Sequence, residues 1–227
     1  MVYYLNMRKE PFLIGQYYHI YNRGTDKRII FKSKQDLERF LMSIKRFNTL
    51  DPIGHIRYGL DNPKRNQKLV DIICYSLNPN HYHLILSPLV ENGIEKFMQK
   101  LGAGYTMYIN EKYKRSGVLL QGKFKSILIK TDKYLMYLSA YVNLNNKIHF
   151  LSRSNSKKEK LFYKSSWDEF IKENKENICN KAIILDRYEG NISEYKEFAE
   201  SVAKGIIERR IDLNINLDED ILIEKIK

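Results

Sequence analysis

The stretch LVDIICYSLNPNHYHLILSP, residues 69–88, decides the fold because it has the pattern of two apolar strands joined by a tight turn. Residues 69–77 and 81–88 are rich in β-branched and aromatic side chains, and the Asn-Pro-Asn between them is typical of a turn. The sequence therefore predicts an antiparallel hairpin. In its second strand, His81 and His83 alternate with apolar residues, so both imidazoles point to one face.

Strand and helix patterns flank this hairpin in a regular order. The expected elements are a strand over 16–24, a helix over 33–48 with Ser33 as its cap, a helix over 92–117, a strand over 118–130 and a helix over 131–148 capped by Thr131. Residues 51–68 carry prolines, glycines and polar residues and predict a long loop. The order β-α-β-β-α-β is that of a ferredoxin-like α+β sheet, for which we expect helices on one face.

Charge divides the chain into two parts. The 227 residues carry a formal net charge of +12, and residues 1–158 hold 27 Lys and Arg against 11 Asp and Glu, whereas residues 159–227 hold 12 against 16. We expect one main domain over 1–158 and an acidic helical C-terminal extension over 159–227, after a Lys/Ser-rich joint at 152–160. The basic field attracts polyanions, most commonly nucleic acid, and the alternative is charge that serves solubility alone.

Several classes of protein are excluded by what the sequence lacks. Cys74 and Cys179 are the two cysteines and have no CxxC partner, so we expect neither a disulfide framework nor a cysteine zinc site. No apolar run is long enough to cross a bilayer, and the N-terminus lacks the pattern of a signal peptide. No GxxxxGK[ST] loop is present, which argues against a nucleotide cofactor. We expect a cytoplasmic protein without membrane association.

Two pairs of residues are candidates for chemistry. His81 and His83 form a potential bidentate metal clamp, and the alternative is two buried imidazoles hydrogen-bonded within a sheet. Tyr141 and Asn145 stand four residues apart on a predicted helix and therefore on one face, where an amide oxygen could complete a metal site beside a tyrosine nucleophile. Tyr141 is one of 17 tyrosines, most of which we expect to be packing residues. The histidines left unassigned are His19, His55 and His149.

Taken in order, these motifs resemble those of the REP-associated tyrosine transposases, a branch of the single-tyrosine HUH transposases related to insertion-sequence enzymes. PNHYHLIL supplies the His-hydrophobic-His motif. The other similar segments are YYHIYNRGTDKRIIF, YTMYINEKYKRSGVLLQGKFKSILI, YLMYLSAYVNLNN and YKSSWDEF, which extend the resemblance over about residues 15–170. The chain departs from the family's usual Asn-Pro-Val-Arg-Ala at residues 145–149, Asn-Asn-Lys-Ile-His.

This resemblance implies a function and a site. Tyr141 is the expected nucleophile, and His81, His83 and Asn145 are the expected ligands of a divalent metal, Mg²⁺ or Mn²⁺, with zinc as a possibility in purified protein. The implied reaction cleaves single-stranded or hairpin DNA through a 5′-phosphotyrosine and rejoins strands. One alternative is a protein derived from such a transposase that binds hairpin DNA or RNA without cutting it. Another is a replication-initiator or relaxase nuclease.

A basic segment over 96–133 is the expected DNA surface. It holds nine Lys and Arg against Glu111 and Asp132, and aromatic residues are interleaved with the charges, a mixture suited to unpaired bases and phosphates. The alternative is that the aromatics form the core stripe of a helix, which we favour for Tyr105 and Tyr108. The predicted DNA contacts are Arg23, Lys112, Lys114, Arg115, Gln121, Lys123, Phe124 and Lys125. We expect a monomer or homodimer.

Overall fold

A five-stranded antiparallel sheet forms the centre of the protein. The computed structural model describes residues 11–52, 67–151, 161–172 and 177–212. The strand order is β4-β1-β3-β2-β5. The strands are β1 (Tyr17–Arg23), β2 (Val70–Asn78), β3 (His81–Pro88), β4 (Lys125–Ile129) and β5 (Lys164–Ser165), and each neighbouring pair is antiparallel. The predicted α+β class, the hairpin and the ferredoxin-like element order are confirmed.

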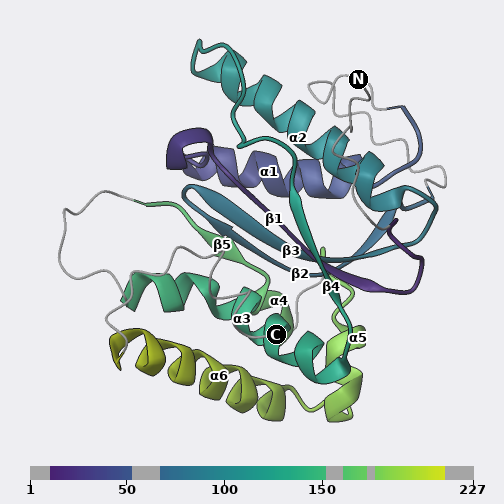
Figure 1. Cartoon of the computed structure of the whole chain (residues 1–227), viewed down its shortest axis with the longest axis vertical. Helices are drawn as coiled ribbons and strands as arrows, with labels where there is room; N and C mark the ends of the chain where they lie inside the picture. The colour runs from purple at the N-terminus through teal and green to yellow at the C-terminus, as the bar shows by residue number, and fades with distance from the viewer. Residues whose placement is uncertain (1–10, 53–66, 152–160, 173–176, 213–227) are drawn as a thin grey trace, which may run out of the picture.

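The helices cover both faces of this sheet, so the expectation of helices on one face holds for the two helices of the ferredoxin-like order but not for the helices that follow them. Helices α1 (Lys34–Phe47) and α2 (Gly93–Lys112) lie on one side, whereas α3 (Asp132–Leu151) lies on the other with α6 (Ile192–Asp212) behind it (Figure 1). All residues of β3 are buried. Tyr82 packs against Phe40 of α1, and His83, on the opposite face, packs against Tyr141 of α3. A strand that is buried on both faces requires other elements to pack on both faces, and here the helices do so.

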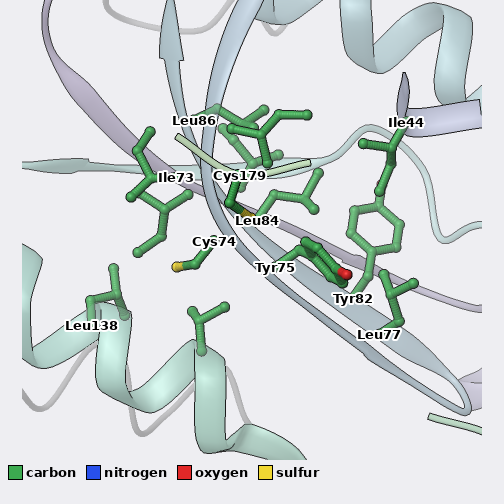
Figure 2. Close-up of a cluster of buried hydrophobic side chains, with 14 of the residues drawn as sticks. Ile44, Ile73, Cys74, Tyr75, Leu77, Tyr82, Leu84, Leu86, Leu138 and Cys179 are labelled. Carbon is green, nitrogen blue, oxygen red and sulfur yellow. The ribbon is translucent and has the colours of Figure 1, made fainter. Parts of the chain in front are cut away.

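The side chains of the hairpin divide between these two layers. Figure 2 shows Tyr82 on the side of Ile44, a residue of α1, and Cys74 on the side of Leu138, a residue of α3. Both cysteines are free and buried, as expected for a chain without a disulfide, and burial raises the pKa of the Cys74 thiol. The hairpin is therefore the common core of the two helical layers.

The predicted helix starts are confirmed by their caps. The Ser33 hydroxyl accepts from the backbone N–H of Asp36, and the Asp36 carboxylate accepts from the backbone N–H of Ser33, which is a complete capping box for α1. At the start of α3, the Thr131 hydroxyl accepts from the backbone N–H of Tyr134 at 3.2 Å. These local signals fixed where both helices begin.

The segment between α2 and β4 differs from its prediction. Helix α2 ends at Lys112 rather than near residue 117, and β4 begins at Lys125 rather than at residue 118. Positive φ angles at Lys114, Gly117 and Gly122 turn the chain away from both helix and strand geometry. Leu120 makes an isolated bridge to Gly24. Residues 118–124 therefore run beside β1 without forming a regular strand.

The C-terminal part packs on the same sheet and on α3. Strand β5 pairs with β2, and α6 lies along α3 (Figure 1). The remaining short elements are η1 (Thr25–Lys27), α4 (Trp167–Ile171), α5 (Ala182–Leu185) and η3 (Asp186–Tyr188). The predicted joint at 152–160, most of the predicted loop at 51–68 and His55 lie outside the described residues. In the described part of the chain, no helix is both long and apolar enough to cross a membrane.

Candidate functional site

The two histidines of β3 face α3 and are almost enclosed. His81 is 7% exposed and His83 is 1% exposed. Their ring centroids lie 5.1 Å apart with planes inclined by 78°. Because alternate residues of a strand share a face, the His-hydrophobic-His spacing places both imidazoles in the layer between the sheet and α3. The two imidazoles therefore lie next to each other in this layer, and their predicted role as metal ligands stays a prediction.

Helix α3 delivers the other two predicted residues to this place. The Tyr141 ring lies 5.8 Å from the His83 ring, edge to face. One turn later, Asn145 is fully buried, and its Oδ1 accepts a hydrogen bond of 2.6 Å from the Asn78 amide nitrogen. The same nitrogen lies 2.8 Å from Nε2 of His81. The four residues singled out in the sequence are thus brought together, with Asn78 between them.

The His81 tautomer follows from its two neighbours. Nδ1 of His81 lies 2.7 Å from Oδ1 of Asn80, and an amide oxygen only accepts, so Nδ1 carries the hydrogen. Nε2 is then a bare acceptor, which matches the donor nitrogen of Asn78 on that side. A neutral imidazole with one bare nitrogen is the form that binds a metal.

His83 is held from behind by His19, a residue left unassigned in the sequence. Nε2 of His19 lies 2.9 Å from Nδ1 of His83, and the two rings are nearly parallel at 5.1 Å. Burial, and then the proximity of His83, hold the pKa of His19 well below its ordinary value, so this ring is neutral. Sequence gave no signal for this contact, because it depends on the pairing of β1 with β3.

His149 joins the cluster from the last turns of α3. Its ring lies 5.5 Å from that of His81. Tyr141, Asn145 and His149 stand at successive intervals of four residues, so the helical spacing that linked the first two residues could also have included the third. Asn78 was interpreted only as part of a turn, although it is the last residue of β2.

The donor set fits a divalent cation. Within the described ranges, no three His, Cys, Asp or Glu side chains form a group able to hold a metal, and the polar atoms beside His81 are those of amide side chains. His81 Nε2 and Asn145 Oδ1 both accept from one atom, Asn78 Nδ2, so their lone pairs face a common point. Two acceptors aimed at one positively polarised atom are arranged as two ligands of an ion would be.

Part of the predicted DNA surface borders this cluster. Arg23 stands opposite His81 in the sheet register, and its Nε donates to Oε1 of Gln121 at 2.5 Å. Tyr21 stacks near His83, and Nζ of Lys125 lies 5.6 Å from the Tyr21 ring centroid. Arg23, Tyr21 and Lys125 therefore line the same face and end of the sheet as the histidines.

Other predicted contacts lie elsewhere or are engaged in packing. Nζ of Lys112 donates to the buried Asp36 carboxylate at 2.6 Å, on the opposite face of the sheet. Arg115 donates to the Asn110 side chain and to a backbone carbonyl, and Phe124 stacks on Phe12 at 6.3 Å. Lys114 and Lys123 are exposed. Their predicted contacts with DNA stay predictions, and the contacts of Lys112 connect α2 to the start of α1.

Part of the chain matches the model of a known protein family. Residues 60–145 match the family model described as "Transposase IS200 like", and this segment contains the histidines of β3 as well as Tyr141 and Asn145. The predicted resemblance to insertion-sequence transposases is thus confirmed. Among solved structures, the chain is similar to "Structure of the REP associates tyrosine transposase bound to a REP hairpin", with 14% identity and a TM-score of 0.44, over 64% of this chain and 74% of that chain. No curated protein matches the chain.

Proposed function

From the match of residues 60–145 to IS200-like transposases, we propose that the protein is a metal-dependent DNA strand transferase that cleaves single-stranded or hairpin DNA through Tyr141. The observation that carries this proposal is the placement of a tyrosine ring 5.8 Å from one of two adjacent imidazoles of β3. A nucleophile and candidate metal ligands from segments far apart in the sequence meet in one buried layer.

The proposed step exchanges one phosphoester for another. The Tyr141 oxygen attacks phosphorus, the bond from phosphorus to the 3′ oxygen breaks, and the proton lost by the phenol balances the one gained by the 3′-hydroxyl. A 3′-hydroxyl of another strand can reverse the exchange, so no nucleotide is consumed. A phenol has an ordinary pKa of about 10, so it needs activation at neutral pH. A divalent cation would supply that activation when bound, by polarising the phosphate and offsetting its developing charge.

The other residues have defined parts in this proposal. His81, His83 and Asn145 would hold the cation, and their imidazole and amide donors suit Mn²⁺ or Mg²⁺. Arg23 and Lys125, at the edge of the cluster, meet phosphates of the bound strand. The hydrogen bond from Arg23 to Gln121 supports this role, because it orients the guanidinium before DNA binds.

A second candidate function is supported by the burial of the nucleophile. Tyr141 is only 1% exposed, so a phosphate reaches its hydroxyl only after the surrounding side chains move. A protein that binds hairpin DNA without cutting it would need no such movement. The two candidates share the basic residues and differ in whether Tyr141 forms a bond with DNA.

The test is trapping of a covalent adduct. Protein, Mn²⁺ and a hairpin with single-stranded flanks are incubated, with the label on the 3′ end in one sample and on the 5′ end in another. We expect a denaturant-stable labelled protein from the 3′-labelled DNA alone, because a 5′-phosphotyrosine retains the 3′ segment. Tyr141→Phe removes the adduct, whereas Tyr134→Phe, on the same helix, retains it. Hairpin binding without any adduct identifies the second candidate.

A further inference from the structure

We propose that Asn78 is a further residue of the metal site. Its amide nitrogen holds His81 and Asn145 together when no ion is bound, and its amide oxygen turns to the cation when one binds. This inference rests on the proposed function, because it assigns a ligand to the same centre. It goes beyond the pattern of histidines, tyrosine and helix asparagine that the sequence resemblance supplied.

The position of Asn78 is fixed by the sheet. It is the last residue of β2, stands opposite His81 in the register of β2 and β3, and is 3% exposed. Its backbone is therefore held at the closed end of the hairpin, beside one candidate ligand. A residue in this place reaches the site without any rearrangement of the main chain.

Both side-chain contacts of the Asn78 nitrogen go to candidate ligand atoms. The nitrogen lies 2.8 Å from His81 Nε2 and 2.6 Å from Asn145 Oδ1. A primary amide nitrogen carries two hydrogens, one for each acceptor. The Asn80 oxygen accepts the hydrogen on Nδ1 of His81, so Nε2 is the unprotonated nitrogen of this ring. The lone pair of Nε2 accepts from the Asn78 amide. The amide nitrogen therefore occupies the place where the two lone pairs meet.

Binding of a cation requires these two lone pairs to be released. The amide hydrogens must leave, since a positive ion and an N–H group cannot share the same acceptor lone pairs. A half-turn of the Asn78 carboxamide exchanges its nitrogen for an oxygen of nearly the same size. The oxygen then adds a hard donor to the two imidazoles and the amide of Asn145, which suits Mn²⁺ and Mg²⁺, cations that take oxygen ligands readily.

The experiment measures Mn²⁺ affinity directly, by the electron paramagnetic resonance signal of free aqueous Mn²⁺ during a titration without DNA. We expect Asn78→Asp to bind Mn²⁺ at least about 10-fold more tightly, because it replaces a neutral donor with an anionic one. We expect Asn78→Leu, which keeps the branched shape of the side chain without its polar atoms, to bind at least about 10-fold more weakly. The matched control is Asn143→Asp. Asn143 is a buried amide of α3 whose side chain contacts Tyr195 and Ser166 instead of the site.

The outcomes separate this assignment from the proposed function. If Asn78→Leu binds Mn²⁺ as tightly as the wild type, or more tightly, Asn78 is not a ligand. That result leaves the transferase proposal in place. Wild-type protein that binds no more Mn²⁺ than His81→Ala overturns both proposals. Thermal unfolding of each variant shows whether it is folded. If Asn78→Leu does not fold, Asn78→Asp decides, and an unchanged Mn²⁺ affinity in that variant contradicts the assignment.

Discussion

The Tyr141 ring meets the His83 imidazole edge to face, with ring centroids 5.8 Å apart and planes inclined by 75°. One residue belongs to α3 and the other to β3, so this contact joins the helix layer to the centre of the sheet. The proposed chemistry depends on this contact, because the nucleophile must lie beside the cation that His83 is proposed to hold.

Loss of either imidazole of β3 is expected to separate binding from cleavage. His81→Ala and His83→Ala remove proposed metal ligands, so adduct yield falls at least about 10-fold, whereas affinity for the hairpin changes little because phosphate contacts dominate it. Adduct formation and fluorescence anisotropy with labelled hairpin measure the two effects. A parallel loss of DNA affinity in folded variants would contradict the separation.

His19 is expected to act through His83. His19→Phe fills the space of the ring but accepts no hydrogen bond from Nδ1 of His83, so we expect Mn²⁺ affinity to fall at least about 10-fold. His19→Gln supplies an accepting oxygen and retains most of the affinity. Titration with Mn²⁺ compares both with the wild type. Equal Mn²⁺ affinities of the His19→Phe and His19→Gln variants would show that the contact with His19 does not position His83.

Asp36 is expected to stabilise the protein in a pH-dependent way. Burial alone would raise its pKa, but hydrogen bonds from Lys112 and Tyr113 and the Lys112 charge outweigh burial and lower it. A carboxylate with a lowered folded-state pKa contributes stability above its unfolded pKa of about 3.9 and loses that contribution as the pH falls below it. Asp36→Asn therefore lowers the free energy of unfolding by about 3 kcal/mol at pH 7.

Urea unfolding of the wild type and the Asp36→Asn variant at pH 7 and pH 3 measures this contribution. The difference between the two proteins shrinks at the lower pH, because the unfolded wild-type chain binds a proton at Asp36 below about pH 3.9, whereas the lowered folded-state pKa resists protonation. A difference that stays constant between the two pH values would contradict the assigned electrostatic origin.

Two glycines of α2 are expected to respond in opposite directions to the same substitution. A Cβ on Gly104 would lie 2.5 Å from the buried Phe47 ring of α1, whereas a Cβ on Gly102 would approach only Leu120, at 3.9 Å. Gly104→Ala forces α1 and α2 apart and costs about 1–3 kcal/mol of stability. Gly102→Ala gains about 0.8 kcal/mol from helix propensity. Thermal unfolding distinguishes the two, and stabilisation by Gly104→Ala would contradict this close packing.

Tyr195 is expected to stabilise the packing of α6 on α3. Its hydroxyl accepts from the Asn143 amide at 2.8 Å and lies 3.2 Å from the Ser139 hydroxyl, both on α3. Tyr195→Phe leaves these buried groups without that partner and lowers stability by about 1–3 kcal/mol. Tyr163→Phe, at a side chain that is 49% exposed, is the control with little expected effect. Hydrogen exchange of the α3 amides also accelerates if the contact holds that helix.

Local patterns in the sequence determined much of the fold. The hairpin, the shared face of His81 and His83, and the caps at Ser33 and Thr131 were predicted and are present. Each depends on periodicity or on hydrogen bonds between residues a few positions apart, which a single chain specifies without distant partners. The helical spacing of Tyr141 and Asn145 was fixed in the same way.

Tertiary structure alone decided which of these groups meet. The hydrogen bond from Asn78 to Asn145 spans 67 positions in sequence, and the contact between His19 and His83 spans 64. The cover of both sheet faces and the partnership of Lys112 with Asp36 depend on equally distant contacts. Such contacts form because packing buries apolar faces and brings their polar neighbours together. Short-range periodicity orients a side chain, but only the assembled layers determine what it faces.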